Sequence, residues 1–551
     1  MAKYNGEALT TYTPRGKWAD LHRTLSAIGT VHVENVHILA NLEPFRYASP
    51  DFIQKSVQAM HNVYHANGLH LYPESSYWDW PYTADKAEKR LLQIDRDAMW
   101  YKAWARYAWK ANRDREDELD YWSKLYGEYF STSQYDGQQI LKALEEDGEI
   151  APKLLRRYGI TDGNRQTLTL GMLMTQLINP FRYGLFTLLY ESEAPEGEMI
   201  IDYVEKEWKG QQHIGETPVQ IAKEVVEHGH NAVEAIKTVA ATSINQNQDE
   251  FLRLRDDVYA YDLLANFYAE KVNAALHILR FKYSNDIADL EKGLPYLEKS
   301  LEYYRDLAKL TEETYLYANS MQTKQRKIPM RGVDKTFIHW KEMVPVFETE
   351  LQNFKNSIDS LKRTHKSSIV NVQPYKNAKV RFLGKQETVL LHKAQTIFAD
   401  DSVKVQDLAP ELAGLKTLLL SSEKQQKEGT AIDFVTEKPV TVLVGFFQTK
   451  EKAGEFSPSP ELETDASANN YGQAESKISN GLIVGDLPPV NVHAYTFPAG
   501  KNSLTLAKGK ALILGFVDAK EKIRIYDAGL SGNGRDIDWL FGEYAPTDVK
   551  L

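Results

Sequence analysis

In the first 85 residues, apolar runs of strand length alternate with stretches of helical spacing. One apolar run covers 31–40 and a second covers 69–72. Between them, helical spacing begins at Pro50, where Ser49 is placed to cap the helix. Strands that alternate with helices are typical of βα units and a parallel sheet. About three units are visible, whereas a (β/α)8 barrel needs eight, so this region is predicted to be a partial (β/α)8 barrel or a small α/β domain complete in itself.

Residues 86–362 are almost entirely helical in their spacing. Apolar positions alternate three and four residues apart through 294–308, as they do in the seam between packed helices. Trp100, Trp104 and Tyr107 form an aromatic stripe at helical spacing, which indicates a buried face. The region is predicted to be a helical bundle, with boundaries near Asn285 and Pro295. The expected helices cover about 166–191, 218–242, 248–281, 286–322 and 336–362.

From residue 363 the pattern changes to strand-length apolar pieces punctuated by Gly, Pro and Asn. Several short strands at this spacing are typical of an antiparallel sandwich. The predicted chain is therefore multidomain, with α/β, all-α and all-β regions in that order. They are a partial (β/α)8 barrel over 1–85, a helical bundle domain over 86–362 and a C-terminal antiparallel β-sandwich domain over 363–551.

Composition and charge limit the partners. The net charge is −10 and no Lys/Arg cluster is interleaved with aromatic residues, so no nucleic-acid partner is predicted. The chain has no cysteine, which excludes disulfides and thiolate metal sites. It has no apolar run of about 18 residues, so no membrane span is predicted. Because the first residues lack the apolar core of a signal peptide, we expect a cytoplasmic protein, or a periplasmic one if an upstream segment carries the signal.

Polar and aromatic residues follow both apolar runs of the N-terminal region. Glu43 and Arg46 follow the first run, and Glu74, Trp78 and Asp79 follow the second. Parallel α/β enzymes keep their chemistry just past the C-terminal ends of buried strands. Aromatic rings beside carboxylates also suit sugars, because the C–H-rich face of a pyranose lies on a ring while its hydroxyls need acids. These two stretches predict the rim of a carbohydrate site.

Three acids are the predicted catalytic residues. Glycoside hydrolysis needs two carboxyl groups on opposite sides of the scissile bond. Glu43 and Glu74 hold equivalent places after neighbouring strands, which would bring them within about 5–10 Å of each other, the range of glycosidase pairs. Asp79 lies between two tryptophans, and desolvation by their rings would raise its pKa. Alternatively, Glu43 and Glu74 are loop acids that cap the following helices.

A second set is predicted to bind the sugar. Arg46 could hold a uronic-acid carboxylate through two parallel hydrogen bonds, or it could form a salt bridge with a neighbouring acid. Arg96 could point towards the pocket, or it could pair with Asp95. The predicted substrate-binding residues are Asn41, Arg46, Tyr72, Trp78, Trp80, Tyr82 and Arg96.

Neither a metal site nor a cofactor is predicted. His61 and His65 are one helical turn apart, as metal ligands can be, but no acid lies between them as a zincin motif requires. A solvated helix face explains this pair better. The sequence also has no P-loop, no dinucleotide-binding glycine motif and no nucleophile elbow.

Three stretches within about residues 30–110, NLEPFRYASPDFIQ, GLHLYPESSYWDWPYTAD and DRDAMWYKAWARYAW, are similar to large glycoside hydrolases of polysaccharide-degrading Bacteroidetes. The domain order also resembles that of α-glucuronidase-type enzymes. The resemblance implies that rim acids act as general acid and as base or nucleophile, which would fall on Glu43, Glu74 or Asp79. The family's earlier barrel strands are absent here. The resemblance therefore implies a C-terminal portion whose N-terminal barrel half would lie in the full-length protein, and which would be inactive alone if it lacks half its site.

Together these patterns predict a glycoside hydrolase, or a fragment of one, that acts on an oligo- or polysaccharide substrate of the acidic plant or algal type. Two alternatives remain. One is a non-catalytic carbohydrate-binding or accessory protein. The other is a polysaccharide lyase with the helical region as an α/α toroid, although the helical region lacks a clear sixfold repeat of hairpins.

Overall fold

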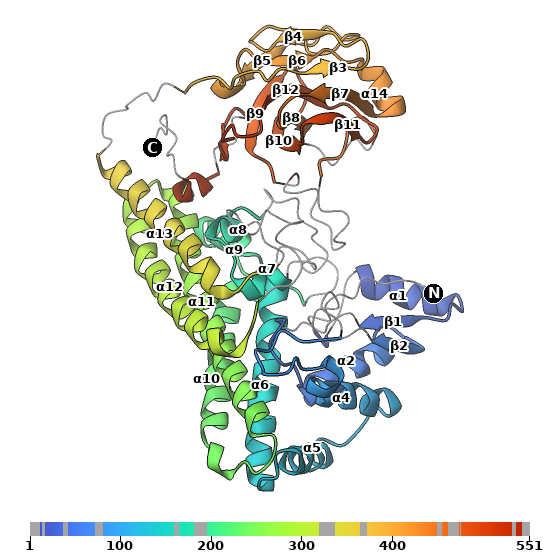
Figure 1. Ribbon diagram of the computed structural model, residues 1–551, viewed down its shortest axis with the longest axis vertical. Coiled ribbons are helices and arrows are strands. Elements are labelled where there is room, and N and C mark those ends of the chain that lie inside the picture. The colour runs from blue at the N-terminus through green and yellow to red at the C-terminus, as the bar shows by residue number, and fades with distance from the viewer. Residues whose placement is uncertain are drawn as a thin grey trace. The chain divides into compact units, whose positions relative to one another are not determined.

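The computed structural model of the chain has mixed helical and sheet structure, in agreement with a multidomain α/β protein (Figure 1). Apart from Asn179 and Pro180, the described residues up to Gln352 form one compact unit; those two residues and the residues from Asn353 on form a second. The division into three domains stays a prediction. The described residues are 11–13, 17–36, 42–71, 81–158, 165–180, 195–318, 337–363, 372–448, 454–460, 473, 475–531 and 536–542.

The first unit begins with helix α1 (Lys17–Ala27), followed by a βα unit made of β1 (Val33–Val36), α2 (Pro50–Asn62) and β2 (Gly68–Leu71). The two strands pair in parallel along their whole length, so that both end at the same edge. The predicted parallel pairing is therefore confirmed for these two strands. The partial (β/α)8 barrel stays a prediction, because β1 and β2 are the parallel strands that the described part of this region contains.

Helix α2 starts where its capping residue predicts. The Ser49 side chain accepts a hydrogen bond from the backbone N–H of Phe52, and Pro50 occupies the first helical position. Proline costs nothing there, since that N–H has no partner within the helix. The chain that connects β1 to α2 therefore ends at Ser49.

Helices make up nearly all of the remaining described part of the first unit, as predicted, and Figure 1 shows α6, α10, α11 and α12 side by side. In the described parts of the chain, no helix combines the length and the apolar character that crossing a membrane requires. The helices are α3 (Gln93–Arg96), α4 (Ala98–Trp109), α5 (Arg115–Phe130), α6 (Gln134–Tyr158), α7 (Arg165–Leu170), α8 (Met174–Ile178), α9 (Ile200–Lys209), α10 (Pro218–Lys237), α11 (Gln248–Ser284), α12 (Ile287–Thr314) and α13 (Trp340–Arg363).

Two predicted helix boundaries differ from the structure. The single helix expected over 166–191 is broken, because α7 ends before Gly171, whose φ of +93° is not helical. A Cβ on Gly171 would lie 2.9 Å from the rings of both Tyr304 and Phe347, so only glycine fits this turn. Pro295 lies inside α12 rather than at its end. The boundary predicted at Asn285 is confirmed, since this residue caps the C-terminus of α11 at a φ of +52°.

The aromatic stripe of α4 is buried, as its spacing predicts. Trp100, Trp104 and Tyr107 are fully buried, and they share a core with Phe52 of α2 and Trp122 of α5. The indole N–H of Trp122 donates to the Tyr107 hydroxyl at 2.8 Å. This core joins the βα unit to the first helices that follow it, so the position of α2 depends on the packing of α4 and α5.

We expect the substitution Gly137→Ala to lower the free energy of unfolding by about 1–3 kcal/mol, the usual cost of overpacking. Gly137 lies where α6 meets α5, and a Cβ there would lie 2.0 Å from the Ser123 carbonyl oxygen. Urea-induced unfolding measures the change. The matched control is Gly68→Ala, whose added methyl meets no atom within 4 Å; equal stability of the two variants would contradict the expectation.

The described strands of the second unit pair mainly antiparallel, as predicted, although β13 pairs in parallel with β9. The largest sheet has the order β12-β8-β10-β9-β13, with β5 also paired to β9, and a smaller sheet has the order β11-β7-β3. Apolar side chains of both sheets share one core. The sandwich architecture itself stays a prediction. The elements are β3 (Arg381–Phe382), β4 (Thr388–Leu390), β5 (Val405–Leu408), β6 (Lys416–Leu418), α14 (Ser422–Glu428), β7 (Thr430–Thr436), β8 (Val440–Phe447), β9 (Ile478–Val484), β10 (Val490–Phe497), β11 (Gly500–Leu506), β12 (Leu512–Asp518) and β13 (Tyr526–Asp527).

Candidate functional site

The two predicted rim segments leave the sheet side by side. Val36 and Leu71, the last residues of β1 and β2, are paired in register. The segments that follow, 37–41 and 72–80, lie outside the described residues. With them lie six of the predicted site residues, namely Asn41, Tyr72, Glu74, Trp78, Asp79 and Trp80. The structure thus places the start of both segments at one edge of the sheet.

The chain that follows the two segments is also brought together. Arg46, shortly after the first segment, donates from Nη2 to Oδ1 of Asp85, shortly after the second, at 2.7 Å. Asp85 is fully buried and Arg46 is only 6% exposed. The described chain is thus joined before the two segments by the pairing of β1 with β2 and after them by a buried ion pair.

Arg46 uses every N–H of its guanidinium group on protein acceptors. Nε and Nη2 donate to the two carboxylate oxygens of Glu250 at 2.6 and 2.9 Å. Nη1 donates to Asp257 at 2.9 Å and to the Tyr315 hydroxyl at 3.3 Å. With the bond from Nη2 to Asp85, all five donors are engaged. The salt-bridge alternative for Arg46 is thus what the structure contains, and binding of a uronate by Arg46 would require one of these acceptors to be displaced.

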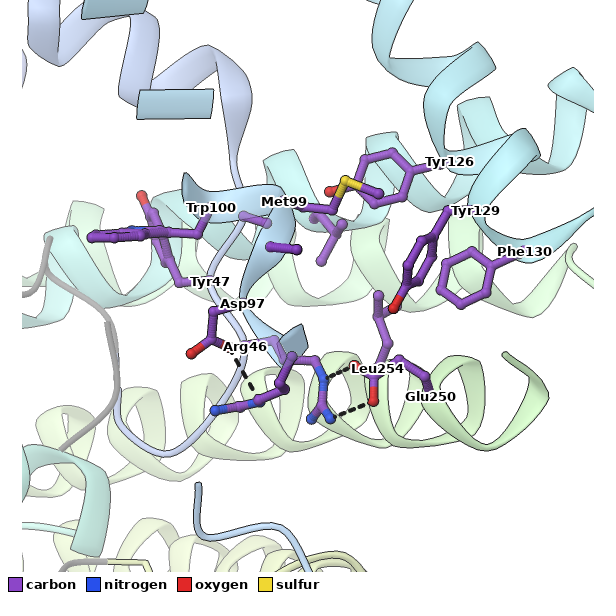
Figure 2. A pocket seen from close by; sticks show the side chains of 14 residues that line it. Arg46, Tyr47, Asp97, Met99, Trp100, Tyr126, Tyr129, Phe130, Glu250 and Leu254 are labelled. Carbon is purple, nitrogen blue, oxygen red and sulfur yellow. Dashed lines mark hydrogen bonds and ion pairs between the residues drawn. The ribbon is translucent and has the colours of Figure 1, made fainter. Parts of the chain in front are cut away.

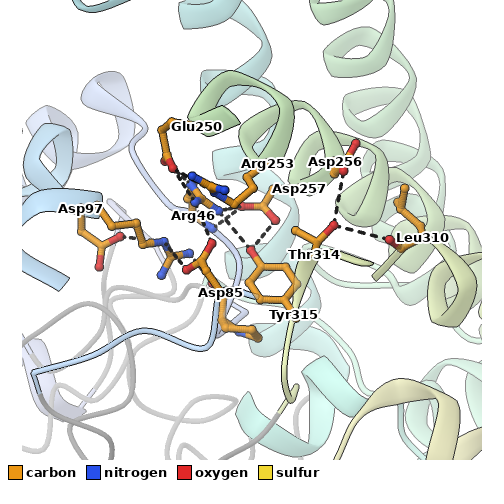
Figure 3. Close-up of polar contacts among 12 residues, drawn as sticks. Arg46, Asp85, Asp97, Glu250, Arg253, Asp256, Asp257, Leu310, Thr314 and Tyr315 are labelled. Atoms are coloured by element: carbon orange, nitrogen blue, oxygen red, sulfur yellow. Dashed lines mark hydrogen bonds and ion pairs between the residues drawn. The ribbon is translucent and has the colours of Figure 1, made fainter. Parts of the chain in front are cut away.

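A second buried arginine extends the network. Arg96 Nε lies 3.3 Å from Oδ2 of Asp85 and 3.3 Å from Oδ1 of Asp97. Its Nη2 donates to the carbonyl oxygen of Pro44, the residue that follows Glu43. Arg96 thus holds the backbone next to one predicted catalytic acid, and it contacts the same aspartate as Arg46. We call the whole set the Arg46–Arg96 cluster (Figure 3): Arg46, Asp85, Arg96, Asp97, Glu250, Asp257 and Tyr315.

The cluster holds more acids than bases, and the acids respond differently. Burial by itself would raise the pKa of Asp85, but the two arginines more than offset it and hold this pKa at about 2. Burial raises the pKa of Asp97 to about 6, against the opposing effects of Arg96 and Arg46. Burial likewise raises the pKa of Asp257. Asp85 is therefore ionised at neutral pH. Asp97, in contrast, takes up and releases its proton near pH 6.

The raised pKa of Asp97 predicts a pH-dependent stability. The folded protein keeps this proton up to about pH 6, whereas the unfolded chain loses it near pH 3.8, so the contribution to stability falls as the pH rises between these values. Asp97→Asn removes this titration. Between pH 4 and pH 7, the free energy of unfolding of the wild type should therefore fall by about 2–3 kcal/mol relative to that of the variant. Urea unfolding at both pH values measures this. Asp95→Asn, at an exposed neighbouring position, should leave the shape of the pH curve unchanged; parallel curves for Asp97→Asn and wild type would contradict the assignment.

A pocket adjoins the cluster (Figure 2). Arg46, Arg96 and Asp97 line its polar side, and its other walls include Trp100 and Tyr126. Its empty volume is about 440 Å³, which includes the open mouth. The polar side chains on one wall suit ordered water beside Asp97.

Of the predicted residues that the structure describes, Glu43 is 5% exposed and Tyr82 is 41% exposed. Tyr82 forms an isolated antiparallel bridge with Leu92, and the Arg90 guanidinium lies 5.1 Å from the centre of its ring. Glu43, Arg46 and Arg96 come together through Pro44 and Asp85. Tyr82 precedes Asp85 by three residues on the second segment's return. Their roles with a substrate stay predictions.

The acids that hold Arg46 are not among the site residues predicted from the sequence. Glu250 and Asp257 lie on α11, seven residues apart, which is close to two helical turns and places them on one face. Asp257 is buried beside Leu254, Val258 and Tyr261. An acid inside an apolar helical stripe was a readable signal, since a buried carboxylate needs a cationic partner. Asp85 and Tyr315 carried no comparable signal, because an antiparallel bridge between distant segments pairs them.

Among the described residues, one group has three possible metal-ligand atoms within 4.8 Å of one another, and it consists of His22, His32 and Glu34. His22 belongs to α1, His32 directly precedes β1, and Glu34 belongs to β1. No metal site is predicted from the sequence, in which no ligand motif links these three residues.

The chain is similar over 98% of its length to the solved structure of a "GH138 enzyme targeting pectin rhamnogalacturonan II", with 47% sequence identity and a TM-score of 0.88. The chain spans 62% of the length of that protein. No protein-family model matches the chain, and no curated protein does. The neighbour supports the glycoside-hydrolase part of the resemblance drawn from the sequence, but not its α-glucuronidase-type part.

Proposed function

We propose that the chain contributes to a glycoside hydrolase that cleaves an acidic pectic polysaccharide of plants. The observation that carries the proposal is the 47% identity to a GH138 enzyme over 98% of this chain. The substrate class follows from the description of that enzyme, which names rhamnogalacturonan II. The acidic polysaccharide expected from the sequence agrees with a pectic substrate.

The proposed catalytic groups are two carboxyls among Glu43, Glu74 and Asp79. One carboxyl gives a proton to the glycosidic oxygen, and the other attacks the anomeric carbon or activates water. The register of β1 with β2 supports this assignment, since Glu43 and Glu74 follow strands that end side by side. The ion pair between Arg46 and Asp85 supports it from the other end of the two segments.

In this proposal the Arg46–Arg96 cluster positions the catalytic segment rather than touching the sugar. Arg96 binds the carbonyl oxygen of Pro44 and thereby fixes the backbone beside Glu43. Arg46 binds α11 through Glu250 and Asp257. A catalytic carboxyl must be held to within a fraction of an ångström of its reacting atom, and a buried network of this kind restricts its backbone. Trp78, Trp80 and Tyr82 are the proposed stacking residues, and Asn41 and Tyr72 the proposed polar contacts.

To test this proposal, the full 551-residue chain is incubated with rhamnogalacturonan II. The products are then analysed by mass spectrometry and ultraviolet absorbance. The proposal predicts new reducing ends without ultraviolet-absorbing ends. Unsaturated products would establish a lyase instead. Binding of the polysaccharide without any product after long incubation would establish a carbohydrate-binding protein. Either of these two results would overturn the proposal.

A further inference from the structure

The group His22, His32 and Glu34 brings three polar atoms to one buried point. Nδ1 of His22 lies 2.6 Å from Nε2 of His32 and 2.6 Å from Oε1 of Glu34. Nε2 of His32 lies 2.9 Å from the same Glu34 oxygen. The exposed fractions of the three residues are 1%, 0% and 2%. Bulk water therefore does not reach the triangle that these atoms form.

With Glu34 ionised, hydrogen atoms alone do not satisfy every contact of this triangle. Only the two imidazole nitrogens can then carry a proton, and each N–H points to one acceptor. If both nitrogens are protonated, two donors face each other at 2.6 Å. If only one is protonated, it donates to Oε1 of Glu34, as His32 can, and the lone pair of the other imidazole nitrogen faces the same oxygen.

A further buried polar atom lies beside the triangle. Tyr64, which follows α2, is fully buried, and its ring centre lies 4.5 Å from that of His22. Its hydroxyl has no hydrogen-bond partner among the described residues. Burial and then the charge of Glu34 raise the pKa of this hydroxyl, so the two groups lie within electrostatic reach of each other. An unsatisfied buried hydroxyl costs about 1–3 kcal/mol unless something binds it.

We propose that His22, His32 and Glu34 bind one divalent transition-metal ion of the zinc type, with the Tyr64 hydroxyl or a water as a further ligand. Two imidazoles and one carboxylate form a known ligand set for such ions. A cation at the centre lets all three lone pairs point at one partner. Metal–ligand bonds of about 2.0–2.2 Å in a tetrahedral site separate ligand atoms by roughly 3.3 Å, so the triangle would open by about half an ångström on binding.

The proposed ion has a structural role. His22 comes from α1, while His32 directly precedes β1 and Glu34 lies two positions further along, within β1. The metal would therefore join α1 to β1. A hydrogen bond from the Ser26 hydroxyl to the carbonyl oxygen of His65 already joins α1 to the residues just after α2. Because β1 leads into the first rim segment, the ion would stabilise the strand from which that segment departs.

In the test, a chelator first removes bound metal from the wild-type protein, and zinc chloride is then added. Bound zinc is measured by mass spectrometry, and the thermal unfolding midpoint is measured with and without zinc. We expect about one zinc ion per chain. At a free zinc concentration 100 times the dissociation constant, the unfolding equilibrium constant should fall about 100-fold. Glu34→Gln and His22→Asn should lose both effects. The matched control, His61→Ala at an exposed position on α2, should keep both.

Two results would overturn the proposal. One is stripped wild-type protein that takes up no zinc and keeps the same unfolding midpoint with and without zinc. The other is Glu34→Gln protein that retains the zinc content and midpoint shift of the wild type, which would assign the zinc to exposed histidines. Neither readout involves turnover of a polysaccharide, so this proposal can fail while the proposed hydrolase activity holds, and the reverse.

Discussion

Replacing Arg46 by methionine should lower the free energy of unfolding by about 3–5 kcal/mol, the cost of removing one partner from a buried ion cluster. The substitution keeps an apolar side chain of comparable length but removes five donors. It leaves Asp85, Glu250 and Asp257 without the cation that they share. Asp85 has no exposed surface and Asp257 is only 2% exposed, so water cannot replace the lost contacts. Urea-induced unfolding followed by circular dichroism measures the change.

Two further variants distinguish the stability contribution of the buried cluster from that of an ordinary, solvent-accessible ion pair. Arg253→Met removes an arginine that contacts the same Glu250 at 3.3 Å from a position that solvent reaches, and it should cost about 1 kcal/mol or less. Arg46→Lys should recover only part of the lost stability, because an ammonium group has three donors and cannot bind Glu250 through two parallel bonds. A loss below about 1 kcal/mol for Arg46→Met would contradict the structural role of the cluster.

Glu43→Gln and Glu74→Gln should each lower kcat on rhamnogalacturonan II by about 10²–10⁴-fold, the usual contribution of one acid or base. Each substitution keeps the shape of the side chain and removes its charge and its exchangeable proton. Asp79→Asn should keep most of its turnover if Glu43 and Glu74 form the pair; a loss as large as theirs would place Asp79 in the pair instead. The measurement is the initial rate of release of reducing ends.

The control for these variants is Glu88→Gln, an exposed glutamate in the segment after the second rim stretch, which should keep full turnover. Because Glu43 is buried, its variant also needs a thermal unfolding midpoint, and an unchanged midpoint separates lost chemistry from lost folding. A pair that acts as a unit is non-additive, so the double variant should be no slower than the worse single variant. Wild-type turnover in both single variants would remove these acids from the mechanism.

The sequence was sufficient wherever local rules determine the structure. Ser49 and Pro50 predicted the start of α2, and Asn285 predicted the end of α11. The stripe of Trp100 and Trp104 predicted the buried face of α4. Each of these features depends on residues within a few turns of one another. Their physics is therefore visible in a short window of sequence.

What the sequence did not indicate depends on contacts between distant segments. Arg46 is 211 positions from Asp257 and 204 from Glu250, so its saturation by acids appears only in three dimensions. The helical pattern breaks at Gly171, where two aromatic rings from α12 and α13 leave no room for a Cβ. His22 and His32 meet Glu34 because α1 folds back on β1, although the spacing of these residues resembles no metal motif. Periodicity therefore predicted the elements, but tertiary packing determined which charged groups meet.

The most direct test of the central proposal is hydrolysis of rhamnogalacturonan II in water enriched in ¹⁸O, with the released sugars analysed by mass spectrometry. A glycoside hydrolase adds one water to each bond that it cleaves, so each new reducing end should carry one ¹⁸O. The label should disappear in Glu43→Gln and Glu74→Gln, together with the product. Released sugars without the label, or products with an unsaturated end, would contradict a hydrolase with a carboxyl pair at the ends of β1 and β2.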